Sequence, residues 1–148
     1  MNTLLVTLHV VAVVFVIGPM AILPMTAMRA IKAGHGAQVE TLARSTMVFT
    51  LISLVAAVLG FGALSTVDKK EDNWSITTPW VLISLIVYLL AFALSILAVV
   101  PALRSASEHM VDPGAENLQT ADYKRIAMGS GVVSLLLVVV VVLMVWKP

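Results

Sequence analysis

The chain has 148 residues, of which 60% are hydrophobic and 11% are charged, and its formal net charge is +1. A water-soluble domain of this composition would expose far too much apolar surface, and the length leaves room for a single domain, residues 1–148. The balanced charge, without a basic arm, argues against nucleic acid as a partner, and the absence of cysteine excludes disulfides and thiolate chemistry.

Four apolar segments without a charged side chain fill most of the sequence, at approximately residues 3–28, 46–65, 79–100 and 126–146. Each is close to the ~20 residues that a helix needs to cross the hydrocarbon core of a bilayer. Backbone amides in lipid have no water to bond, so each segment must be helical. We therefore predict an all-α, polytopic membrane protein with a four-transmembrane-helix bundle, in contact with the lipid bilayer.

The first segment is too long for the apolar core of a cleaved signal peptide, and no cation precedes it. We expect it to stay in the membrane with the N-terminus outside. Pro19 and Pro24 each remove a backbone hydrogen bond inside this segment, which predicts a kink near Gly18.

Local signals also place the later segments. Thr78 followed by Pro79 is a typical helix start, with a capping residue and then proline at the first helical position. Residues 115–125 follow a turn at 112–114, and they are expected to form a short interfacial helix before the fourth segment.

The positive charges of the short connections predict the orientation, because such residues are retained on the cytoplasmic side. The connections after the first and third segments carry them: Arg29, Lys32, Arg44, Arg104, Lys124 and Arg125. The connection between the second and third segments has two cations and three anions over residues 68–72, so both termini should face outward. Tryptophan prefers a membrane interface, and Trp74, Trp80 and Trp146 all fall on the predicted outer surface.

Helix association in lipid depends on close packing at small residues. Candidate packing positions recur at helical spacing in the last three segments: Ser53, Gly60, Ser84, Tyr88, Ala91, Ser95, Ala98, Gly131 and Ser134. The run of three leucines and five valines after Ser134 has no small or polar seam, so we expect it to face lipid or a larger protein.

Residues 37–44 have a weak sequence similarity to residues 115–121, which suggests an internal repeat. It is compatible with two helical hairpins of equal orientation related by a pseudo-two-fold axis. A shared compositional bias of cytoplasmic loops is the simpler alternative.

His9 is the one histidine inside a predicted span, and a histidine in lipid is a candidate functional residue. It could ligate haem or copper, contact a quinone or relay a proton; alternatively its neutral imidazole bonds a hydroxyl or a carbonyl on a neighbouring helix. Met20 is more than three turns away and cannot share a metal ion with it. Near the third segment, Glu108, His109 and Asp112 fit either a surface metal site or a solvated loop. We predict no metal site.

The chain has Thr7-Leu8-His9-Val10 early in the first segment, Gly18 later in the same segment, and four predicted helices with an outward N-terminus. In these features it resembles small bacterial predicted integral membrane proteins with a histidine early in the first helix, and its alanine- and valine-rich composition is similar to actinobacterial, particularly mycobacterial, membrane proteins. The resemblance implies a location in the bacterial cytoplasmic (inner) membrane. Relatives often have an aromatic residue and paired glycines after the histidine, where this chain has Phe15-Val16-Ile17-Gly18-Pro19. The resemblance implies no catalytic residue.

The expected function is that of a non-catalytic accessory or scaffold subunit of a larger membrane complex, such as a respiratory or envelope-transport assembly. Packing positions are abundant, whereas none of the eight acidic residues lies within a predicted span, as ion-coupled transport normally requires. The sequence leaves two alternatives open: a small haem- or metal-binding redox protein centred on His9, and a small carrier or pore.

Overall fold

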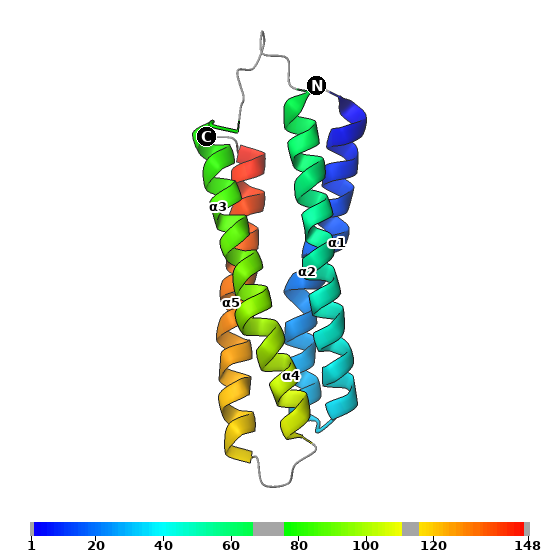
Figure 1. Ribbon diagram of the computed structural model, residues 1–148, viewed down its shortest axis with the longest axis vertical. Coiled ribbons are helices and arrows are strands. Elements are labelled where there is room, and N and C mark those ends of the chain that lie inside the picture. The colour runs from blue at the N-terminus through cyan, green and yellow to red at the C-terminus, as the bar shows by residue number, and fades with distance from the viewer. Residues whose placement is uncertain (1, 67–75, 111–115, 147–148) are drawn as a thin grey trace.

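Two antiparallel helical hairpins make up the computed structural model (Figure 1). The structure describes residues 2–66, 76–110 and 116–146, and their side chains except for 116–121. The first hairpin joins α1 (Thr3–Lys32) to α2 (Gly36–Ser65). The second joins a continuous rod of α3 (Pro79–Leu94), the π-helical turn η1 (Ser95–Val99) and α4 (Val100–His109) to α5 (Glu116–Trp146). The four rods are long and apolar enough to cross a membrane, which confirms the predicted all-α bundle.

The hairpins contact each other mainly through α2 with α4 and through α1 with α5. Within the second hairpin, α3 and α5 run side by side. Both termini lie at the end of the bundle where α3 begins, and the turn between α1 and α2 lies at the opposite end (Figure 1). The six cations that predict orientation all belong to helix segments at this opposite end, which we call the basic end.

The turn between α1 and α2 is only three residues long because Gly34 closes α1 abruptly. Gly34 has a φ of +75°, which favours glycine because a side chain there would be strained. The amide of Gly34 donates to the Ile31 carbonyl at 3.1 Å, and that of His35 donates to Ala30 at 3.0 Å. These two bonds form a Schellman motif, and α2 can begin at once.

The start of α3 is confirmed as predicted, with Thr78 at the N-cap and Pro79 in the first turn. The prediction of a separate interfacial helix before the fourth span is wrong, because α5 is continuous from Glu116 to Trp146. The physical reason is that neither glycine nor proline interrupts residues 116–128. α1 is one helix through Pro19 and Pro24, and the kink expected near Gly18 stays a prediction.

The buried face of α5 extends further than its sequence indicates. Ile126, Ser130, Val133 and Leu137 are all buried at alternating spacings of four and three, the period of left-handed helix packing. Leu137, in the leucine–valine run that was expected to face lipid, belongs to this seam and is 1% exposed. The seam ends there, because Leu135, Val138, Val139, Val141 and Val142 are all exposed, Val141 although it lies one turn after Leu137.

The π-helical turn changes the register of the third span. The amide of Val100 bonds to the Ser95 carbonyl five residues earlier, and Pro101 directly after it has no amide hydrogen to donate. One residue is thereby inserted, so Val99 rather than the predicted Ala98 continues the buried seam after Ser95. Val99 packs against Gly129 of α5. A Cβ added to this glycine would lie 3.1 Å from Val99 Cγ2.

Candidate functional site

The polar side chains of α2 form a ladder along its buried face. Thr46 and Thr50 each bond the carbonyl four residues earlier at 2.8 Å, and Ser53 Oγ bonds the Thr50 carbonyl at 2.6 Å. Such bonds satisfy hydroxyl groups within their own helix. Each hydroxyl of the ladder therefore already donates a hydrogen bond, and none needs a ligand as acceptor.

Ser53 also joins the two hairpins. Its Oγ lies 2.8 Å from the hydroxyl of Tyr88 on α3. Because the Ser53 proton is used in the bond to the Thr50 carbonyl, the tyrosine hydroxyl is the donor and Ser53 the acceptor. Two of the predicted packing residues thus form a directed polar contact between the hairpins.

The other predicted packing residues lie at different places in the bundle. Ser84, Ala91 and Ser95 are buried, Ala98 is half-buried, and Gly60 faces the ring of His9. Gly131 is exposed, and nothing lies within 4 Å of where its Cβ would be. Ser134 Oγ is buried without a hydrogen-bond partner among the described residues.

His9 belongs to the contact between α1 and α2. Its Nδ1 lies 2.8 Å from the carbonyl oxygen of Ala56. A Cβ on Gly60, one turn further along α2, would lie 2.8 Å from Cε1 and 3.1 Å from Nδ1 of the same ring. The glycine therefore provides the space that the imidazole occupies.

This contact determines which ring nitrogen carries the proton. A carbonyl oxygen only accepts, so Nδ1 of His9 must be the protonated nitrogen that donates to Ala56. In the neutral ring, Nε2 then keeps its lone pair. Histidines that bind metals usually have this arrangement, with the remote N–H held by a carbonyl or carboxylate.

His9 belongs to no larger group of potential metal ligands in the part of the chain that the structure describes. Groups of three or more His, Cys, Asp or Glu side chains that could hold a metal ion do not occur there. His109 of the proposed surface site instead contacts another helix, and Asp112 lies outside the described residues.

Asp122 is a residue that the sequence reasoning missed. Its Oδ2 lies 2.8 Å from Nδ1 of His109, and its side chain is 8% exposed, so the end of α4 is tied to the start of α5. Its position in the sequence could have indicated its burial, because Asp122 precedes Ile126 by one helical turn on the buried seam of α5. A carboxylate at a seam position needs a partner from a neighbouring helix.

The predicted interface cations are all exposed at the basic end of the bundle: Arg29, Lys32, Arg44, Arg104, Lys124 and Arg125. Of these, Arg44 pairs with Glu40 on its own helix at 3.7 Å. Lys32 Nζ lies 5.3 Å from the ring centroid of Tyr123 on α5. The positive charge of α1 is therefore held close to the first turns of α5.

The tryptophans do not share one environment. Trp146 is largely exposed, Trp74 lies outside the described residues, and Trp80 is buried. Trp80 is buried because it is on the same face of α3 as Ser84 and Tyr88, and that face points into the bundle. Its expected place at the membrane interface stays a prediction.

Comparison with known proteins gives a match to one family. The family model described as "Predicted integral membrane protein (DUF2269)" matches residues 3–148. Neither the curated proteins nor the solved structures contain a significant match. Since the family model covers nearly the whole chain, the chain belongs to the DUF2269 family of predicted integral membrane proteins.

Proposed function

We propose that the protein is a non-catalytic accessory or scaffold subunit that packs laterally against a larger complex, such as a respiratory or envelope-transport assembly, in the bacterial cytoplasmic membrane. We place the basic end in the cytosol and both termini outside. The proposal is supported chiefly by an outward-facing stripe on α1.

That stripe, the α1 stripe, consists of Val11, Phe15, Gly18, Ile22 and Met25, at spacings of four and three. Its bulky members are exposed, Phe15 by 72%, and nothing lies within 4 Å of the position of a Cβ on Gly18. This period is that of left-handed helix pairs, in which a small residue allows two backbones to approach closely.

Nothing in the described part of the chain occupies the space beside Gly18, yet glycine in a helix interior costs about 1 kcal/mol relative to alanine. A helix of another subunit seated on the α1 stripe would account for it. The polar groups agree with a structural role, since His9, Thr46, Thr50, Ser53 and Tyr88 are bonded to the backbone or to each other.

The test is purification from the native host in a gentle detergent, followed by mass spectrometry of the intact assembly. The wild-type chain should emerge with one stoichiometric partner. Gly18→Leu, whose Cβ would have nothing within 4 Å, fills the stripe and should release the partner. Gly131→Leu, at an equally open glycine on α5, should retain it.

Two results would reject the accessory role. One is a wild-type protein that always emerges alone, and the other is an assembly that contains only copies of this chain. Retention of the partner by Gly18→Leu would reject the α1 stripe as its docking site.

A second candidate function, a haem- or metal-binding redox protein, is favoured by the bond between His9 Nδ1 and the Ala56 carbonyl. Because that bond leaves the Nε2 lone pair available, the ring is oriented as a metal-ligating histidine usually is. An absorption spectrum of the purified protein tests this, since a bound haem gives a Soret band that His9→Ala should remove. A spectrum without such a band, from protein grown with added haem, would leave His9 as a packing residue.

A further inference from the structure

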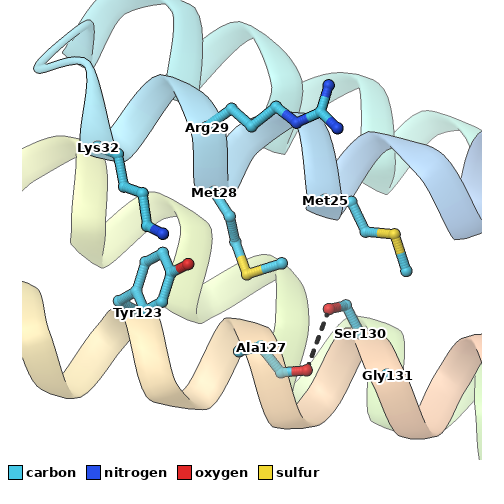
Figure 2. A pocket seen from close by; sticks show the side chains of 8 residues that line it. All are labelled: Met25, Met28, Arg29, Lys32, Tyr123, Ala127, Ser130 and Gly131. Carbon is cyan, nitrogen blue, oxygen red and sulfur yellow. Dashed lines mark hydrogen bonds between the residues drawn. The ribbon is translucent and has the colours of Figure 1, made fainter.

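At the basic end, a groove with a volume of about 340 Å³ lies between α1 and α5. Figure 2 shows Lys32 and Tyr123 facing each other at one end of it, with Met25 and Arg29 further along α1. On the α5 side the groove is lined by Ala127 and Gly131. One end of the groove is therefore cationic and aromatic, and the rest of it is mainly apolar.

The groove carries uncompensated positive charge. Neither Arg29 nor Lys32 forms an ion pair within the described residues, and no carboxylate lines the groove. A second groove, between α2 and α4, has Arg104 together with Glu108 and is therefore balanced. Charge complementarity favours an anion in the first groove only.

The position of the groove matches the headgroup layer of a bilayer. A helix of 30 residues such as α1 is about 45 Å long, whereas the hydrocarbon core is about 30 Å thick. Arg29 and Lys32 lie within the last turn of α1, at the level of lipid phosphates.

The rest of the groove suits a hydrocarbon chain. Met25 lines the groove from α1 and is 46% exposed, and on α5 Ala127 has only a methyl group and Gly131 has no side chain. The space above Gly131 is open, since nothing lies within 4 Å of the position of its Cβ. A soluble phosphate would use the cationic end alone.

We propose that this groove is a binding site for an anionic phospholipid, with the phosphate at Arg29 and Lys32 and one acyl chain along Met25, Ala127 and Gly131. Basic grooves between membrane helices at the cytoplasmic surface have the chemistry for such headgroups. The groove shares Met25 with the α1 stripe, but the lipid site depends on this chain's own residues and not on the proposed accessory role.

The test uses the full chain, delipidated in detergent, with phosphatidylglycerol and phosphatidylcholine of identical acyl chains and native mass spectrometry to count retained lipid. Phosphatidylglycerol should be retained preferentially. The double variant Arg29→Gln/Lys32→Gln should lower its retention on the order of tenfold, whereas Arg44→Gln/Arg104→Gln, with the same loss of charge at the same surface, should not.

A second variant tests the apolar part. Gly131→Leu should reduce retention of phosphatidylglycerol, whereas Gly18→Leu, at an equally open glycine outside the groove, should leave it unchanged. Equal retention of the two lipids by the wild type, or equal losses in the two charge variants, would overturn the proposal. Displacement of the lipid by inorganic phosphate at equal concentration, together with full binding by Gly131→Leu, would show a phosphate site instead.

Discussion

The imidazole of His9 fills the space left by Gly60, since a Cβ at that glycine would lie 2.8 Å from Cε1 of the ring. A histidine on α1 and a glycine on α2 thus form one packing unit, with the Ala56 carbonyl as the hydrogen-bond acceptor. The pair fixes how α1 and α2 lie against each other near the end where the chain begins.

Gly60→Ala should therefore be destabilising, although alanine is the better helix former. The added methyl group must displace the ring and break its bond to Ala56, at a cost of about 1–3 kcal/mol in the free energy of unfolding. Thermal unfolding in detergent measures this. Gly18→Ala, where the space is open, is the matched control, and adding His9→Ala to Gly60→Ala should relieve the clash. Equal effects of the two glycine substitutions would contradict this account of the contact.

The Tyr88–Ser53 bond predicts an asymmetry between two single substitutions. Tyr88→Phe leaves Ser53 bonded to the Thr50 carbonyl, so the loss should be only about 0.6 kcal/mol, the usual value between membrane helices. Ser53→Ala strands the tyrosine hydroxyl in an apolar interior and should cost more, about 1–3 kcal/mol. A double-mutant cycle of unfolding free energies is the measurement. If Tyr88→Phe proves the more costly, the assigned direction of the bond is wrong.

The His109–Asp122 contact predicts a second asymmetry, at the basic end. His109→Ala leaves the buried carboxylate of Asp122 without its partner, whereas Asp122→Asn keeps a hydrogen-bonding side chain beside His109. We expect the histidine substitution to cost more, on the order of 1–3 kcal/mol. Hydrogen exchange at the amides of α4 should report the loosening, with Arg44→Ala, in an exposed pair on α2, as the control. Unchanged exchange in His109→Ala would mean that the pair does not hold α4 to α5.

The proposed orientation can be tested directly because the chain has no cysteine of its own. Asn2→Cys, at the first turn of α1, should react in intact cells with a membrane-impermeant maleimide. Gln38→Cys, exposed at the start of α2, should react only after the cells are permeabilised. The reverse pattern would place the basic end outside and reject the proposed topology.

The sequence by itself determined the class and the helix ends opposite the basic end, whereas at the basic end every helix extends beyond its predicted span. Uncharged apolar runs of bilayer length can only be helices in lipid, and Thr78-Pro79 and Gly34-His35-Gly36 mark where helices begin and end through local backbone chemistry. These features depend on neighbouring residues along the chain, so they could be read without knowing the fold. The gathering of six cations at one end followed from the same reasoning.

Tertiary structure alone decided which faces meet. The π-helical turn before Pro101 moves the seam from Ala98 to Val99, and Leu137 is buried although its neighbours in sequence resemble lipid-facing residues. The pairs of His9 with Gly60 and of His109 with Asp122 join residues on different helices. The physical reason is that lipid is as apolar as a leucine side chain, so hydrophobicity does not distinguish the inner face of a helix from its lipid-facing side. Packing and hydrogen bonds between helices determine which face lies inside.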